Sequence, residues 1–303
     1  MQFMGLIVLA LLSFQAEAVA PLAMTQAAEG VYVHVGVTEL PDKINHGAIA
    51  NIGFIVGERC VAVVDTGGNP EEGLALKAAI TEVTNKPICY VINTHVHPDH
   101  IYGNRAFQDG KVKFVGHQKL ARAMSSRGSY YLEKAQEQLA VQLTAQDLIP
   151  PDIAVNETLK LDLGQRELVL TAHPTAHTDN DLSVYDAKTD TVWLSDLLFT
   201  THLPVIDGSA KGWLQEMEKL ERQHFTTVIP GHGAIVKDWP KSLQPQKHYI
   251  QGLITEIRQL QKQGKFLEDA VANLKYTAAH EWALVNEFHR KNITSTFAEL
   301  EWE

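Results

Sequence analysis

Residues 94–100 read THVHPDH and place three histidines and one aspartate within a few positions of one another. The apolar run 88–92 precedes them and predicts a buried strand that ends at this loop. Imidazole nitrogen and carboxylate oxygen are atoms that zinc binds at about 2.0 to 2.2 Å. A lone His-x-His pair is common on protein surfaces, but the complete string at a strand end predicts a metal site.

Three further donors lie far along the chain, namely His177 in TAHTDN, Asp196 in SDLLF and His232 in PGHG. A solitary histidine is more often a packing or surface residue than a metal ligand. These three residues are therefore candidate ligands only when they are considered together with the first cluster. With the first cluster they make seven donors, enough for two metal positions that share one carboxylate. We assign His95, His97 and His177 to one metal, Asp99, His100 and His232 to the other, and Asp196 to the bridge.

A metal pair with open positions predicts hydrolysis. Metal-bound water ionises near pH 7, and the resulting bridging hydroxide attacks while the second cation polarises the substrate oxygen. We expect Asp99 to position this hydroxide and to accept its proton while remaining a ligand. The absence of thiolate donors favours zinc, with manganese and iron left open. The expected reaction is hydrolysis of a small ester, thioester, lactone or lactam.

Asp65 ends the apolar strand 60–64, and the helical pattern 70–84 connects it to the strand that carries the histidines. A parallel crossover of this kind places the ends of its two strands side by side. Asp65 should therefore lie next to the histidine loop. There it either orients a ligand imidazole or the loop backbone, or it is only a turn residue before the helix.

The rest of the chain predicts a second sheet and more helices. Residues 117–145 and 213–223 have helical patterns, and residues 239–303 are mostly helical. Short apolar runs separated by turns predict antiparallel hairpins; they are residues 159–163, 168–172, 182–185 and 192–194, with a further strand at 226–229. The segment after Asp196 carries three residues that either line a substrate groove or pack in the core: His202, Asp207 and Trp213.

Composition limits the classes of function. The chain has 303 residues, is 45% hydrophobic and has a formal charge of −10, so it can bury a sizeable core. This charge argues against binding to nucleic acid or to anionic membranes, and we expect a small-molecule substrate. Cys60 and Cys89 lie in apolar, strand-like runs, and we expect buried free thiols there and no bridge.

The first 18 residues resemble an export signal. An apolar run at 3–12 is too short to span a bilayer, and Ala16-Glu17-Ala18 suits cleavage after Ala18. No Lys or Arg precedes the run, which departs from the usual pattern. We expect a signal peptide at 1–18, a periplasmic location, and no membrane attachment after cleavage.

The motifs THVHPDH, TAHTDN, SDLLF and PGHG, in that order, resemble the metallo-β-lactamase superfamily, and their ligand types are similar to its glyoxalase II branch. The resemblance implies an α/β fold, a four-layer αββα sandwich over residues 30–236, with the dinuclear site at one edge between the sheets. Residues 239–303 would then form a C-terminal helical extension. The expected cofactor is two zinc ions per chain.

The segments NIGFIVGERCVAVVDTGG, THLPVIDGSAKGWL and FAELEWE more narrowly resemble the quinoprotein relay system zinc metallohydrolases, an exported group. This resemblance implies a quinoprotein dehydrogenase system as partner. Two other functions stay open. One is a mononuclear iron persulfide dioxygenase, which needs only two histidines and one aspartate. The other is a non-enzymatic quinoprotein assembly or binding factor, although structural zinc sites are usually closed and rich in cysteine.

Overall fold

The computed structural model describes residues 19–277 and 280–303, so the predicted signal peptide lies outside the described residues. The first sheet has seven strands in sequential order. Its first four strands pair antiparallel and the remaining neighbours pair in parallel. The strands are β1 (Thr25–Ala28), β2 (Val31–His34), β3 (Ile52–Val56), β4 (Val61–Val64), β5 (Ile88–Asn93), β6 (Lys113–His117) and β7 (Ile153–Val155).

Helix α1 (Pro70–Val83) makes the crossover between β4 and β5. Asn69 begins it as the N-cap, because its side chain accepts a hydrogen bond from Glu72 N, and Pro70 follows in the first turn. Leu76 and Ile80 pack on the outer face of the first sheet. The predicted parallel pairing of the strands before and after this helix is confirmed.

The second sheet has five strands in the order β12-β11-β10-β9-β8. The predicted antiparallel hairpins are confirmed for β8 to β11, whereas β12 pairs in parallel with β11. Strand β11 is buried along its whole length, as expected for a strand covered on both faces. The strands are β8 (Thr158–Asp162), β9 (Glu167–Ala172), β10 (Leu182–Asp186), β11 (Thr191–Phe199) and β12 (Thr227–His232).

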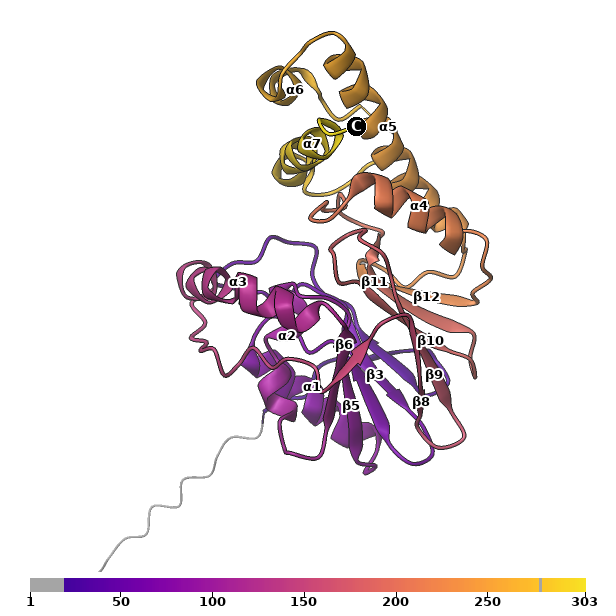
Figure 1. Cartoon of the computed structure of the whole chain (residues 1–303). Helices are drawn as coiled ribbons and strands as arrows, with labels where there is room; N and C mark the ends of the chain where they lie inside the picture. The colour runs from indigo at the N-terminus through magenta and orange to yellow at the C-terminus, as the bar shows by residue number, and fades with distance from the viewer. Residues whose placement is uncertain (1–18, 278–279) are drawn as a thin grey trace, which may run out of the picture.

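The two sheets pack face to face through one apolar core that includes Val64, Ile92, Leu170 and Trp193. Helices cover both outer faces, α1 to α3 on the first sheet and α4 and α5 on the second (Figure 1). The predicted four-layer αββα sandwich is thus confirmed. The covering helices are α1, α2 (Pro98–Ile101), α3 (Leu120–Lys134), α4 (Ala210–Leu220) and α5 (Gln244–Lys262).

The C-terminal region is helical, as predicted. Helices α6 (Leu267–Asn273) and α7 (Val285–Leu300) pack with α5 at the end of the molecule that α4 occupies (Figure 1). Ile293 and Phe297 of α7 are buried in the same core as Ile257 of α5. Among residues 19–277 and 280–303, no helix is both long enough and apolar enough to cross a membrane.

The prediction of free thiols is wrong. Cys60 and Cys89 form a disulfide, with their Cα atoms 5.8 Å apart. They are neighbours because β4 and β5 pair in parallel, with Val61 opposite Ile88. Pairing register is a tertiary property, so two apolar runs did not reveal it.

The predicted helix 117–145 also differs from the structure. His117 ends strand β6, α3 begins only at Leu120, and a π-helical turn at Ala135–Leu139 follows. Strands β1, β6 and β7 were not predicted, because each is short and two of them lie at or near a sheet edge, where pairing outweighs local preference.

Candidate metal centre

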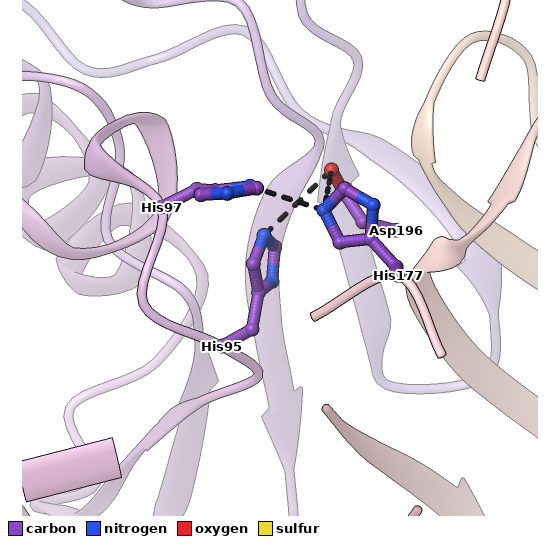
Figure 2. Close-up of side chains that lie close together, drawn as sticks. All are labelled: His95, His97, His177 and Asp196. Atoms are coloured by element: carbon purple, nitrogen blue, oxygen red, sulfur yellow. Dashed lines mark hydrogen bonds and ion pairs between the residues drawn. The ribbon is translucent and has the colours of Figure 1, made fainter. Parts of the chain in front are cut away.

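The predicted donors meet where strand ends of the two sheets come together. The first cluster directly follows β5, Asp196 lies within β11, and His232 is the last residue of β12. His177 belongs to the loop between β9 and β10. His95, His97 and His177 point toward Asp196 from both sheets (Figure 2). Tertiary structure thus brings together side chains that are distant in sequence.

The first group contains His95, His97, His177 and Asp196, whose candidate ligand atoms all lie within 4.8 Å of one another. Asp196 Oδ2 is 3.3 Å from His177 Nε2 and 3.7 Å from His95 Nε2. His177 Nε2 is 3.0 Å from His97 Nδ1. Three nitrogens and one carboxylate oxygen therefore face a common point.

The second group contains Asp99, His100 and His232. Asp99 Oδ2 lies 3.3 Å from His232 Nε2 and 3.6 Å from His100 Nε2. Asp196 reaches this group as well, because its Oδ1 is 3.2 Å from His100 Nε2. Its Oδ2 lies 3.5 Å from His232 Nε2, so the carboxylate contacts donors of both groups and stands where a bridging ligand would stand.

His97 and His177 turn one ring nitrogen each toward the first group, and other residues hold their second ring nitrogens. His97 Nε2 donates to Asp207 Oδ2 at 3.0 Å, and His177 Nδ1 donates to Val205 O at 2.7 Å. Burial lowers the pKa of His177 to about 4, so this ring is neutral at pH 7. Because its Nδ1 donates to Val205 O, the neutral His177 ring has no proton on Nε2, and this nitrogen is free to bind a metal ion.

Buried polar atoms without a hydrogen bond also indicate a metal site. Among the described residues, His95 Nε2, His100 Nε2 and Asp196 Oδ1 are buried without a hydrogen bond of good geometry, although the last two atoms lie 3.2 Å apart. Leaving a buried polar atom unpaired costs about 1 to 3 kcal/mol, so three at one point would be expensive. The donors are nitrogen and carboxylate oxygen without sulfur, and they fit two divalent cations.

The acidic residues hold charge at this site. Burial opposes ionisation of Asp99, but His100 and His232 lower its pKa to about 2. Burial likewise opposes a charge on His232, yet Asp196 and Asp99 raise its pKa to about 9. Both shifts have the same cause, the attraction between the imidazoles and the carboxylates of Asp99 and Asp196, whose negative charge two divalent cations would also neutralise.

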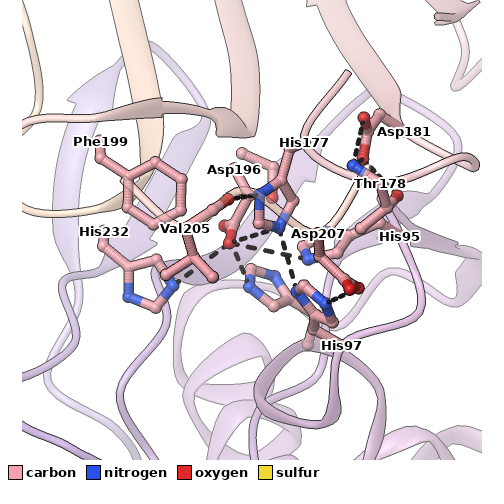
Figure 3. A network of polar contacts seen from close by, with 12 residues as sticks. His95, His97, His177, Thr178, Asp181, Asp196, Phe199, Val205, Asp207 and His232 are labelled. Carbon is pink, nitrogen blue, oxygen red and sulfur yellow. Dashed lines mark hydrogen bonds and ion pairs between the residues drawn. The ribbon is translucent and has the colours of Figure 1, made fainter. Parts of the chain in front are cut away.

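All five ligand imidazoles contact a partner through their other ring nitrogen, as is usual in metal sites, and His95 Nδ1 lies 3.1 Å from Thr94 Oγ1. Besides the donations of His97 and His177, His100 Nδ1 lies 2.8 Å from Asp65 Oδ2 and His232 Nδ1 lies 3.1 Å from Ile49 O. Figure 3 shows the part of this network around His97, His177 and Asp207. Each ring thereby turns its free nitrogen toward the metal positions.

Asp65 lies next to the histidine loop, where the crossover placed it. Its Oδ1 accepts from Thr94 N at 2.8 Å, and its Oδ2 accepts from Thr94 Oγ1 at 2.8 Å. It is fully buried and has a φ of +56°. It therefore contacts both the loop backbone and the ligand ring of His100, the two contacts expected of an orienting carboxylate.

Asn51 holds the loop of His232 and was not predicted. Its side-chain amide donates to Pro230 O at 2.9 Å and to Gly233 O at 2.8 Å, on both sides of the histidine. Its Oδ1 accepts from Gly36 N at 3.0 Å. A buried asparagine with every group paired fixes the backbone around a ligand, but a single Asn in sequence carries no sign of this.

Asn292 of α7 fixes the loop that orients His177. Its side chain donates to Pro204 O at 2.7 Å and accepts from Ile206 N at 2.9 Å, so its bonds flank Val205. Val205 O is the acceptor for His177 Nδ1. The C-terminal region thus reaches the first metal position through one loop, which the sequence did not indicate.

Of the three predicted groove residues, Asp207 lines a groove beside His97. His202 and Trp213 are both buried, and neither lines this groove. Trp213 donates to Leu197 O at 3.1 Å and packs 5.3 Å from the His177 ring. His202 packs 4.8 Å from the His232 ring, so both support ligand rings from within the core.

Fold and site together define a metal-dependent hydrolase. The family model of the metallo-β-lactamase superfamily matches residues 47–232, more than half of the chain and most of the sandwich. The chain belongs to the metallo-β-lactamase superfamily.

Solved structures of similar fold include alkylsulfatases and lactamases. The stereoselective inverting sec-alkylsulfatase Pisa1 from Pseudomonas sp. matches with a TM-score of 0.73 and 17% identity, over 92% of this chain and 50% of that chain. Metallo-β-lactamases from Pontibacter korlensis and Hirschia baltica each match with a TM-score of 0.59, at 19% and 20% identity, over 76% of this chain and 99% and 97% of theirs.

A curated relative, the linear primary-alkylsulfatase of Pseudomonas sp. (strain ATCC 19151), is 32% identical over 73 residues. The match covers 22% of this chain and 14% of the relative. This chain thus spans half of the solved alkylsulfatase and matches a small part of the curated one.

Proposed function

We propose that this protein is an exported dinuclear zinc hydrolase that acts on a small ester, thioester, lactone or lactam. One observation carries the proposal: seven nitrogen and oxygen donors form two groups, and the carboxylate of Asp196 contacts donors of both. Two cations at such positions ionise water near pH 7 and polarise the bond to be cleaved.

Asp99 is the residue for proton transfer. Its side chain is 16% exposed, and it lines a small pocket of about 120 Å³ together with Tyr102 and Tyr131. His100 and His232 hold its pKa near 2, so Asp99 is a carboxylate at neutral pH. While Oδ2 faces the second group, Asp99 Oδ1 would accept the proton of the attacking water and pass it to the leaving group.

Zinc and export rest on separate observations. The donors are imidazole and carboxylate, which suit zinc and leave manganese and iron as competitors. The disulfide between Cys60 and Cys89 supports export, because such bonds persist in oxidising compartments. A periplasmic location is compatible with the proposed quinoprotein dehydrogenase partner, for which the support is sequence resemblance alone.

A sulfate ester is the second candidate substrate. The alkylsulfatase match covers 92% of this chain, and the two lactamase matches cover 76%. The larger coverage means that the alkylsulfatase fold also accounts for chain outside the part shared with the lactamases. A persulfide dioxygenase is disfavoured, because one iron with two histidines and one aspartate would leave four of the seven donors without a role.

The test combines metal analysis and turnover on one sample of protein purified from its native compartment. We expect about two zinc ions per chain and metal-dependent hydrolysis of a compound in a panel of aryl esters, thioesters, lactones, β-lactams and alkyl sulfates. Asp99→Asn should lower kcat by about 100-fold or more, whereas the exposed Asp238→Asn should leave it unchanged. One iron per chain, or no turnover by fully loaded protein, would refute the proposal.

A further inference from the structure

A groove of about 810 Å³ opens beside the first metal position, where His97 and Asp207 form part of its wall. Three segments of the chain enclose it: helix α3, the loop that follows β11, and helix α7 of the C-terminal region. A space of this size accommodates a small organic molecule. The groove therefore gives a substrate room for a portion that extends away from the bond cleaved at the metals.

The side of the groove formed by α3 and the loop is largely apolar. Tyr130 and Tyr131 come from α3, and Val205 and Ile206 from the loop. Tyr130 is 59% exposed, which is unusual for an aromatic side chain and frequent in ligand sites. This wall fits a flat or aliphatic body.

The walls of the groove carry more cationic than anionic side chains. Asp207 is its single acidic wall residue, and it is already paired with Arg127 and with His97. Arg290 and Lys291 of α7 also line the groove, and neither forms an ion pair with any residue in the described part of the chain. Two uncompensated cations thus face a groove in a protein whose formal charge is −10.

Helix α7 is held firmly enough to place these cations. Asn292, the next residue, is fully buried and bonds to the loop that forms the opposite wall. Phe288, one turn earlier, packs 5.3 Å from the His202 ring, and Lys291 Nζ lies 5.6 Å from the Phe288 ring centre. The position of the cationic wall relative to the metal centre is therefore fixed by packing.

We propose that this groove binds an organic anion, an apolar body that ends in a carboxylate or sulfonate-type group, with Arg290 and Lys291 as its cationic contacts. Guanidinium and ammonium groups make charge-assisted hydrogen bonds to such oxygens. The inference rests on the proposed function in one respect: the anionic end belongs to the part of the hydrolase substrate that is remote from the cleaved bond.

Binding of two matched probes tests the groove without turnover. 2-Naphthoate and 2-naphthamide have nearly the same shape and differ in charge. Calorimetric titration of zinc-loaded wild type should show naphthoate binding about tenfold more tightly than naphthamide, the order expected for charge-assisted contacts. R290E/K291E should abolish this preference. K262E/K265E, which makes the same change in charge at exposed positions outside the groove, should preserve it.

Three outcomes would overturn the inference: no preference for naphthoate in wild type, an undiminished preference in R290E/K291E, or a preference that disappears when zinc is removed by a chelator. The last would mean that the carboxylate binds the metals. R290Q/K291Q serves as a second variant without charge reversal, and matched Tm values exclude misfolding. Failure of the proposed function has a different readout, the absence of hydrolysis by loaded wild type, which this titration does not measure.

Discussion

The carboxylate of Asp207 accepts a hydrogen bond from His97 Nε2 at 3.0 Å and is itself bound by Arg127. This contact fixes the ring so that His97 Nδ1 faces His177. Asp207→Ala should lower zinc affinity at the first position by about 10- to 100-fold. Competition titration with a chromophoric chelator measures the loss. Asp238→Ala, at an exposed carboxylate outside the site, is the control, and equal affinities in both variants would contradict the prediction.

Removal of His232 should empty one position and spare the other. His232 belongs to the group of Asp99 and His100, while the first group keeps its four donors. Elemental analysis of His232→Ala should therefore find about one zinc per chain where wild type has about two. His248→Ala, an exposed histidine outside both groups, should retain the wild-type content. Loss of both ions from His232→Ala would mean that the positions are not independent.

Asn292→Ala should weaken both stability and turnover. The change leaves Pro204 O and Ile206 N without their buried partner, at about 1 to 3 kcal/mol each in the free energy of unfolding. It also removes the hydrogen bonds that hold the loop on both sides of Val205, whose carbonyl oxygen accepts from His177 Nδ1. Urea unfolding and kcat at saturating zinc measure the two effects. Thr296→Val, one turn along the same helix, should destabilise less and leave kcat unchanged; an equal loss of kcat would contradict the prediction.

Glu72 should make stability fall as pH rises. Burial raises its pKa to about 8 from a usual 4.5. Between these values the folded protein keeps a proton that the unfolded chain has released, so this group destabilises the fold progressively from pH 4.5 to 8. Glu72→Gln removes the effect, by at most about 1.4 kcal/mol per pH unit. Its gain in the free energy of unfolding over wild type should grow from pH 5 to 8. Exposed Glu71→Gln should show no such growth.

The disulfide should contribute to stability mainly through the unfolded chain. It joins residues 29 apart in sequence, and loop closure of this length corresponds to about 3 to 4 kcal/mol. Reduction of the wild type, or the variant Cys60→Ser/Cys89→Ser, should lower the free energy of unfolding by this order in urea titration. Two free thiols in unreduced protein from the native compartment would contradict both this prediction and the support for export.

Much of the fold and site could be predicted, because the patterns that indicate strands and metal donors lie within short stretches of the sequence. Apolar runs with turns between them predict strands, and the first donor cluster and His232 stand at or next to strand ends. The crossover between β4 and β5 was enough to place Asp65 beside the histidines, because a parallel unit brings its strand ends together. The short strand β6 has no strong pattern of its own and was not predicted, and the predicted helix included only its last residue, His117.

The supporting residues could not be predicted, for a different reason. Asn51 and Asn292 donate hydrogen bonds to backbone carbonyl oxygens. Every residue has such an oxygen, so the sequence does not show which one is the acceptor. From the sequence, Trp213 could line a groove or pack in the core, and in the structure it is fully buried in the core.

The sequence by itself determined which side chains can bind metal and which strands present them, because residue types and the apolar patterns of strands are visible in the sequence. Only the tertiary structure decided that Asp196 stands between two groups, that Cys60 meets Cys89, and that α7 supplies a cationic wall. The physical reason is that these relationships depend on strand register and on the packing of distant segments, which no single stretch of sequence contains.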